Sequence, residues 1–343
     1  MKYSNSTIEK AGKTLFNSKS EVDVANAEKI IEDWRCQHDY VLNELEKNII
    51  PFLQSYGIGI LDIGRRLKRM SAIKNKMDKH NVWNLSTMQD IGGMRIVLPS
   101  LDVLMQVKTL LSEHAITDFV VNQNCIYDYV NNPRNTGYRS IHVVYKYMPK
   151  EKSNDYYGQK VELQLRTRMQ HFWAMGVETA ELITGKALKN GEGDENWLTF
   201  FKNVSLLFAE VENNSEILKS IHATKKFFVN PKCIEELRSL MASVSYFNSE
   251  KVHDGYYLLN IDYKQRLSQI WLFPKEKQKF AIKKYNTIEH ENKGTSKDVV
   301  LVSVPEMKNL RDMYPSYYLD ASDFINCIQE FVDIKTGLLK NAN

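Results

Sequence analysis

The sequence predicts an α+β protein: a mixed β-sheet flanked by helices, followed by a second, small β-rich C-terminal domain. Residues 161–167 (Val-Glu-Leu-Gln-Leu-Arg-Thr) alternate apolar and polar side chains with the period of two that is typical of a strand. Between residues 94 and 183 the patterns follow the order strand, helix, strand, strand, helix, which is typical of a sheet covered by helices. After residue 250 the chain is rich in aromatic and β-branched residues, which favour strands.

The first region is expected to contain elements set by apolar spacing and by Gly or Pro breaks. They are a helix over 22–52, a break at 57–59, a helix over 62–77, a strand over 94–98, a helix over 101–113, a loop over 131–137, strands over 138–147 and 161–167, and a helix over 170–183. Connecting helices are expected next, over 196–212 and 233–244.

The second region is expected to hold four strands and a last helix. The strands are predicted over 256–263, 267–273, 279–285 and 299–304, and the helix over 321–332. The change in composition toward aromatic and β-branched residues predicts two domains, residues 1–235 and residues 236–343.

Composition excludes some classes of protein. The chain has 343 residues, of which 43% are apolar and 26% charged, as in a folded protein with a real core. No apolar run approaches the roughly 18–20 residues of a membrane span, and the N-terminus lacks the apolar segment of a signal peptide. The four cysteines are far apart, which argues against a cysteine zinc site and favours reduced thiols and a cytoplasmic location. The net charge of +4 permits a polyanionic partner without requiring one.

The predicted helix over 62–77 carries a basic stripe. Lys68, Ala72, Lys76 and Lys79 fall at i, i+4, i+8 and i+11, with more arginines beside them. Like charges at this spacing destabilise a helix by about 0.2–0.5 kcal/mol per pair, so a bound polyphosphate would explain the stripe. The alternative is a solvated face with no ligand.

A carboxylate precedes the strand over 94–98. Asp90 is followed by Gly92 and Gly93, which allow close approach of backbone or ligand, and Arg95 then enters an apolar strand. A carboxylate at a strand edge is a suitable Mg²⁺ ligand when phosphate oxygens complete the shell. An ordinary turn or capping role for Asp90 is the alternative.

Two predicted strands present polar faces. Tyr138 and His142 share one face of the strand over 138–147, and a tyrosine after a glycine-containing loop is suited to stack on a nucleobase. Glu162, Gln164 and Arg166 share one face of the next strand, where they could bind metal, base edge and phosphate. Packing of Tyr138 on the sheet, a structural role for His142 and a plain amphipathic strand are the alternatives.

In their order, these motifs resemble the synthetase domain of the RelA/SpoT family, ATP pyrophosphokinases that make guanosine alarmones. The resemblance covers about residues 60–185 and includes the basic segment, Asp90 to Arg95, Asn-Pro-Arg-Asn-Thr-Gly-Tyr-Arg-Ser-Ile-His, Val-Glu-Leu-Gln-Leu-Arg-Thr and Gln-His-Phe-Trp-Ala. It implies the family's nucleotidyltransferase-like fold for the first domain.

The resemblance also implies roles for individual residues. The ATP phosphates would be bound by Arg66, Lys68, Lys76, Lys79 and Arg95. Asp90 would hold Mg²⁺, and Glu162 would complete the metal site or activate the acceptor hydroxyl. The acceptor would be stacked by Tyr138 and placed by Arg134, His142, Gln164 and Arg166. The family often has Ser where this chain has Ala72, which puts one contact to ATP in doubt. His38-Asp39 lacks the further acidic ligands of the family's hydrolase domain, so no alarmone hydrolysis is expected.

Further motifs look like a single-chain subgroup, of the CapRel type, in which a synthetase-like toxin is fused to an antitoxin-like domain. These motifs include Trp-Arg-Cys-Gln-His at 34–38 and Gly-Lys-Ala-Leu-Lys at 185–189. Such toxins pyrophosphorylate the 3′-CCA end of tRNA, and a Tyr-x-x-Tyr element blocks their ATP site until a phage protein binds. Tyr314 and Tyr317 match that element, although the pattern is short in a chain with 18 tyrosines. The alternatives are an alarmone synthetase that uses GDP or GTP, and a non-catalytic RNA- or protein-binding module.

Overall fold

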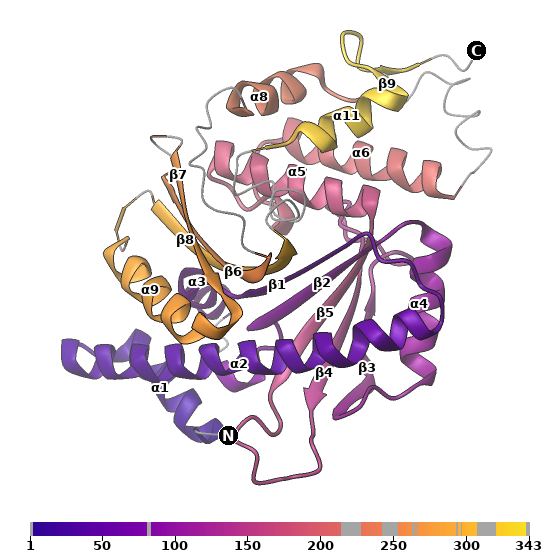
Figure 1. The fold of residues 1–343 in the computed structure, drawn as a ribbon. Coiled ribbons are helices and arrows are strands. Elements are labelled where there is room, and N and C mark those ends of the chain that lie inside the picture. The colour runs from indigo at the N-terminus through magenta and orange to yellow at the C-terminus, as the bar shows by residue number, and fades with distance from the viewer. Residues whose placement is uncertain are drawn as a thin grey trace.

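A computed structural model describes residues 3–80, 84–213, 228–241, 253–262, 265, 267–292, 294–295, 297–306 and 320–340 (Figure 1). The described helices are α1 (Asn5–Asn17), α2 (Glu21–Ser55), α3 (Met70–His80), α4 (Leu101–Glu113), α5 (Arg168–Thr184), α6 (Glu195–Glu212), α8 (Pro231–Met241), α9 (Gln278–Glu291) and α11 (Ser322–Phe331), with short 3-10 turns at Leu85–Thr87, Leu188–Asn190 and Lys275–Lys277. None of these helices is long and apolar enough to cross a bilayer.

One eight-stranded mixed sheet runs through the molecule. Its strands are β1 (Asp62–Leu67), β2 (Gly92–Leu98), β3 (Phe119–Asp128), β4 (Ile141–Tyr147), β5 (Lys160–Thr167), β6 (His253–Asp262), β7 (Leu267–Pro274) and β8 (Lys297–Glu306). Their order is β3-β4-β5-β2-β1-β8-β6-β7, and only the β2–β5 pairing within it is parallel. A separate hairpin pairs β9 (Val332–Asp333) with β10 (Leu338–Leu339). The α+β class and the mixed sheet flanked by helices are confirmed.

Helices cover the two faces of the sheet differently (Figure 1). On one face α2 and α4 enclose an apolar core with the inward residues of β1 to β5, among them Met94, Ile96 and Leu163. Gly92 allows α2 to approach closely, because a Cβ there would lie 3.1 Å from the His38 Cβ. On the other face α5 lies over β2 and β5, and a second core joins α5 to α6, α8 and α11. That second face carries the polar row of β5.

The helix predicted over 62–77 is wrong in its first half. Residues 62–67 form β1, which pairs with β2 on one side and with β8 on the other. Ile63, Arg65 and Leu67 face α2, while Arg66 points to the opposite face, so the segment has strand alternation that its many charges obscure. Arg65 is buried, and its Nε forms an ion pair with Glu46 of α2 at 2.7 Å, so its role is to hold β1 against α2. The i, i+4 stripe therefore does not exist, because Lys68 precedes α3.

The strand predicted over 279–285 is also wrong, since these residues belong to α9. Ala281, Tyr285 and Ile288 are buried at helical spacing while Phe280 is 66% exposed. The sequence analysis also missed β3, whose pairing with β4 shifts register between Val121 and Ile126. That irregularity breaks the alternation from which a strand is predicted.

The C-terminal strands continue the same sheet. β8 pairs with β1 at Arg65↔Ser303 and Arg66↔Val302, and β6 and β7 follow outward. Near the C-terminus, α11 packs on α5, where Phe324 covers Gly176 so closely that a Cβ would lie 2.5 Å from its ring. A β-rich C-terminal region is thus present, and it shares its sheet and one of its cores with the first region. The division of the chain into two domains at residue 235 stays a prediction.

Candidate active site

Five polar side chains form a closed ring on the α5 face of the sheet. Arg166 Nη2 donates to the Tyr138 hydroxyl and to Gln164 Oε1, both at 3.0 Å. Gln164 Nε2 donates to Glu162 Oε2 at 2.6 Å, and His142 Nδ1 contacts Glu162 Oε1 at 3.0 Å. The Tyr138 hydroxyl and His142 Nε2 close the ring at 2.6 Å. The ring holds Glu162 in one orientation on a strand at the centre of the sheet.

Charge within the ring shifts the ionisation of its members. Burial by itself would raise the pKa of Glu162, but the hydrogen bonds from His142 and Gln164 lower it below its ordinary value. Burial would lower the pKa of His142, yet the Tyr138 oxygen and the Glu162 carboxylate raise it overall. Glu162 is therefore a carboxylate at neutral pH, stabilised by donors that fix its orientation.

Asp90 forms a second centre at the entry to β2. Lys68 Nζ lies 2.8 Å from Asp90 Oδ2, and Lys76 Nζ lies 3.0 Å from Asp90 Oδ1. Burial would raise the pKa of Asp90, but the two ammonium groups outweigh burial and lower the pKa to about 2. The lysines thus converge on a carboxylate from two separate elements, the β1–α3 connector and α3.

A third group of charges surrounds Glu178 of α5. Glu178 is paired with Lys189, and Arg66 of β1 and Arg95 of β2 also act on its charge. Burial would raise the pKa of Glu178, but these three cations lower it well below its usual range. Sequence reasoning gave no role to Glu178, although an acidic residue within the aromatic and apolar stretch of α5 is a usable signal.

Backbone register brings the three groups onto one surface. Arg66 of β1 is opposite Gly93 of β2, and Gly93 is opposite Glu162 of β5. Among the described residues, a Cβ at Gly93 would come within 4 Å of the Arg66 carbonyl oxygen alone, at 3.9 Å, so Gly93 places no side chain between Arg66 and Glu162. The charge of Asp90 also acts on Glu162. A phosphate chain and two carboxylates can therefore meet over Gly93.

Most of the predicted site residues come together on this face. Of the residues predicted to bind the ATP phosphates, those found here are Arg66, Lys68, Lys76 and Arg95. The two predicted metal ligands, Asp90 and Glu162, lie with them. So do the residues predicted to bind the acceptor, which are Arg134, Tyr138, His142, Gln164 and Arg166. The Lys79 side chain lies outside the described part of the chain, as do Tyr314 and Tyr317.

Tyr138 does not present its ring to solvent. The side chain is 8% exposed and packs against Trp173 with ring centroids 6.1 Å apart. Tyr129, the residue after β3, is more exposed than Tyr138 and was not among the predicted site residues. Arg134 covers the Tyr129 ring at 4.6 Å and donates to its hydroxyl at 3.0 Å. Base stacking by Tyr138 stays a prediction, and it requires Tyr138 to leave this packed position.

Residues 65–182 match the family model described as "Region found in RelA / SpoT proteins". Over these residues the chain is similar to RelA/SpoT proteins. Among curated relatives, the Bacillus subtilis protein named GTP pyrophosphokinase YwaC is 26% identical over 159 residues, covering 42% of this chain and 73% of its own length. GTP pyrophosphokinase YjbM of the same organism is 36% identical over 115 residues, covering 32% of this chain and 50% of YjbM.

Solved structures include the small alarmone synthetase 1 of Bacillus subtilis bound to its product pppGpp. It is 24% identical, with a TM-score of 0.46, and the match covers 57% of this chain and 99% of that one. The chain spans half of YjbM and about three quarters of YwaC. The RelA/SpoT region and the named pyrophosphokinases support a pyrophosphotransferase enzyme.

The cluster around Glu178 predicts a specific response to acid. The unfolded chain protonates this carboxylate near its ordinary pKa, whereas the folded chain does so only at lower pH, so the stabilisation is present above about pH 4.5 and is lost below it. We expect Glu178→Gln to flatten the fall in unfolding free energy between about pH 5 and pH 3, by up to about 1.4 kcal/mol per pH unit. Urea unfolding at a series of pH values measures this slope. Exposed Glu113, at the end of α4, provides the control Glu113→Gln, and equal slopes in both variants would contradict the account.

Proposed function

We propose that the protein is an ATP-dependent pyrophosphokinase that transfers the β,γ-pyrophosphate of ATP to a ribose 3′-hydroxyl. The observation that carries the proposal is the presence of two partly buried carboxylates, each held by its own polar partners, with the charge of one acting on the other. Asp90 is held by Lys68 and Lys76 at the entry to β2, and Glu162 is held within a polar ring on β5, where it lies opposite Gly93. Transfer of phosphoryl groups depends mainly on positioning and on neutralising charge, which such a surface supplies.

The cations on this face would bind the triphosphate. Lys68 and Lys76 neutralise Asp90 in the free protein and can turn to phosphate oxygens when ATP enters. Arg66 and Arg95, with Lys79 from the sequence, would complete the phosphate contacts. AMP leaves as the β-phosphate bonds to the acceptor oxygen, so cations near the α-phosphate would stabilise the leaving group.

Asp90 and Glu162 fit a magnesium ion by their chemistry. Mg²⁺ is bound by one or two carboxylates together with substrate phosphates, and Asp90 is near enough for its charge to act on the ionisation of Glu162. A bound Mg²⁺ would polarise the β-phosphate. Glu162 would also be placed to accept the proton of the attacking 3′-hydroxyl, while His142 and Gln164 keep its carboxylate oriented.

For the acceptor, we propose the 3′-CCA end of tRNA. The support is the resemblance of the sequence to fused toxin–antitoxin proteins that act in phage defence. The relatives named GTP pyrophosphokinase favour a second candidate, synthesis of (p)ppGpp from GDP or GTP.

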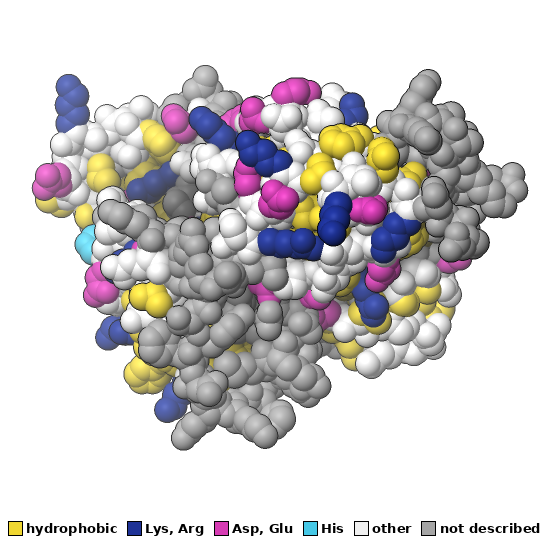
Figure 2. Space-filling view, turned by 90° about the horizontal axis from the view of Figure 1, so that it is seen from above, with side chains coloured by type: hydrophobic (Ala, Val, Ile, Leu, Met, Phe, Trp, Pro, Cys, Tyr) yellow, Lys and Arg dark blue, Asp and Glu magenta, His cyan; other side chains and the backbone are white. Residues whose placement is uncertain are grey.

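Figure 2 shows the side of α6, α8 and α11, where the described basic side chains alternate with acidic ones. A tRNA backbone would therefore be held by cations elsewhere, such as the exposed pair Lys283 and Lys284 of α9. The presence of both carboxylate centres argues against a non-catalytic module.

Autoinhibition by Tyr314 or Tyr317 is part of this proposal, with a phage protein as the trigger. The elements on either side of these residues support it. β8, which ends at Glu306, pairs with β1 beside Arg66, and α11, which begins at Ser322, packs on α5. A tyrosine ring can occupy a base site by stacking, and a tethered segment acts at a local concentration on the order of mM.

The deciding experiment supplies γ-labelled ATP with either GDP and GTP or deacylated tRNA. It uses the full chain and its Tyr314→Ala and Tyr317→Ala variants, because removing the C-terminal region would strip β8 from β1 and Phe324 from α5. Label on tRNA, increased by a tyrosine substitution, is expected. Label confined to guanosine nucleotides would replace tRNA by GDP or GTP, and no transfer to either acceptor would refute the pyrophosphokinase.

A further inference from the structure

Lys68 and Arg69, which connect β1 to α3, and Met70, the first residue of α3, are held by three different elements. The Lys68 carbonyl oxygen accepts a hydrogen bond from Arg35 of α2 at 3.3 Å. Arg69 pairs with Asp298 at the start of β8. The Met70 backbone N–H donates to Glu289 Oε1 of α9 at 3.0 Å. This connector carries Lys68 and leads into the helix that carries Lys76.

The residue before helix α3 is Arg69, whose guanidinium has no hydrogen-bond acceptor and therefore cannot cap the helix. Basic residues precede it, and no acidic residue lies in its first turn. The carboxylate of Glu289, more than 200 positions later in the chain, accepts the first N–H of the helix instead. A negative charge at this position also interacts favourably with the positive end of the helix dipole. The N-terminus of α3 thus depends on α9.

Glu289 is itself fixed from α2 and α9. Its Oε2 accepts from Arg35 Nη2 at 2.9 Å, and its Oε1 also accepts from the Tyr285 hydroxyl at 2.6 Å. Arg35 is fully buried and donates to the same hydroxyl at 2.7 Å. The carboxylate therefore cannot turn away from Met70 without breaking a buried network.

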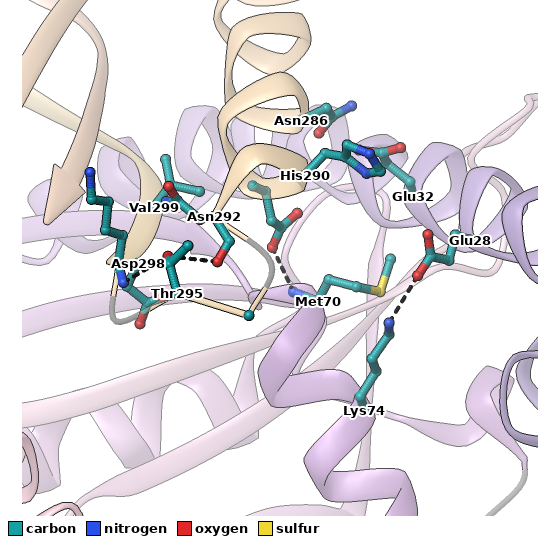
Figure 3. Close-up of a pocket in the computed structure, with 13 residues that line it drawn as sticks. Glu28, Glu32, Met70, Lys74, Asn286, His290, Asn292, Thr295, Asp298 and Val299 are labelled. Carbon is teal, nitrogen blue, oxygen red and sulfur yellow. Dashed lines mark hydrogen bonds and ion pairs between the residues drawn. The ribbon is translucent and has the colours of Figure 1, made fainter. Parts of the chain in front are cut away.

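The apolar side of α3 packs against α1 and α2, whereas the buried residues of α9 belong to a different apolar cluster. A pocket of about 330 Å³ lies between α2, α3, α9 and β8. Figure 3 shows Met70 and Lys74 of α3 on one side of it, His290 and Asn286 of α9 on another, and Glu28 of α2 facing Lys74, which it pairs with at 2.9 Å. Because the space beside the junction is open, α9 acts on α3 through polar contacts.

We propose that Glu289 is a positioning residue for ATP, which sets the place of Lys68 and Lys76 by capping α3 from the C-terminal region. The inference rests on the proposed function of these lysines in binding ATP. It assigns α9 a role separate from that of Tyr314 and Tyr317. A movement of α9 would change ATP binding without any residue entering the ATP site.

Glu289→Ala tests this in the full chain. We expect the KM for ATP to rise about fivefold, the effect of losing a helix cap of ordinary strength, with the KM for the acceptor unchanged. Amide hydrogen exchange in residues 68–76 should become faster. Glu291→Ala, at an exposed position on the same helix, is the control and should change neither. Tyr285→Phe, which removes one hydroxyl from the network, should shift both readouts in the same direction by less.

The outcomes separate the two proposals. If Glu289→Ala and Tyr285→Phe match Glu291→Ala in exchange and in KM for ATP, or if both KM values rise together, the positioning role is overturned. Hydrogen exchange and the binding of a non-hydrolysable ATP analogue need no acceptor. They therefore decide the role of Glu289 even if the parent chain transfers label to nothing, a result that would refute only the pyrophosphokinase.

Discussion

Glu162→Gln is expected to lower the rate of pyrophosphate transfer by about 10²–10⁴-fold, the range associated with a group that moves a proton in the transition state. The substitution keeps the size of the side chain but removes its charge. One of the two donors that now face Glu162, from His142 or from Gln164, would then meet an amide N–H₂ group. Both the orientation and the negative charge at this position are lost. A coupled assay of AMP release measures the rate.

Two further observations separate this loss from unfolding. The variant should unfold cooperatively at nearly the parent temperature, as should the control Glu113→Gln on the opposite side of the sheet. By NMR titration, the pKa of His142 should fall, because the Glu162 carboxylate that raises it is gone. Activity within a few-fold of the parent would remove Glu162 from the reaction.

Phe324→Ala is expected to destabilise the whole molecule by about 3–5 kcal/mol, the usual cost of emptying a buried aromatic site. Phe324 is 1% exposed, and its ring contacts those of Phe200, Phe201 and Phe208 with centroids 5.8–6.2 Å apart. It also fills the space over Gly176 of α5. Since domains are stable by only about 5–15 kcal/mol, this single loss in α11 should weaken α5 as well.

Chemical unfolding followed by tryptophan fluorescence measures the effect, because Trp173 of α5 and Trp197 of α6 lie in the same core. Asn326→Ala, at an exposed position of α11, should change stability by less than about 0.5 kcal/mol. If Phe324→Ala were as mild as Asn326→Ala, α11 would be a loosely attached appendage. A regulatory C-terminal domain could then be removed without harm to α5.

The elements of the candidate site that the sequence placed correctly are those with regular local patterns. Residues 161–167 alternate cleanly because one face of β5 packs in the core, so Glu162, Gln164 and Arg166 could be placed together from the sequence. The strand around Arg95 and the helix of α5 followed from apolar runs. The basic segment was misassigned because its apolar residues, from Ile63 to Met77, also fit helical spacing. In the structure Arg65 is buried in a sheet, where it pairs with Glu46 of α2.

The sequence alone determined the α+β class, because hydrophobic periodicity is a local property of the chain, and its motif order led to the prediction that Asp90 and Glu162 belong to the site. Only the tertiary structure decided which groups face each other. It placed Asp90 between Lys68 and Lys76, closed the ring around Glu162, and brought Glu289 to the start of α3. These contacts join segments from separate elements, and their geometry depends on strand register and helix packing, which no local pattern encodes.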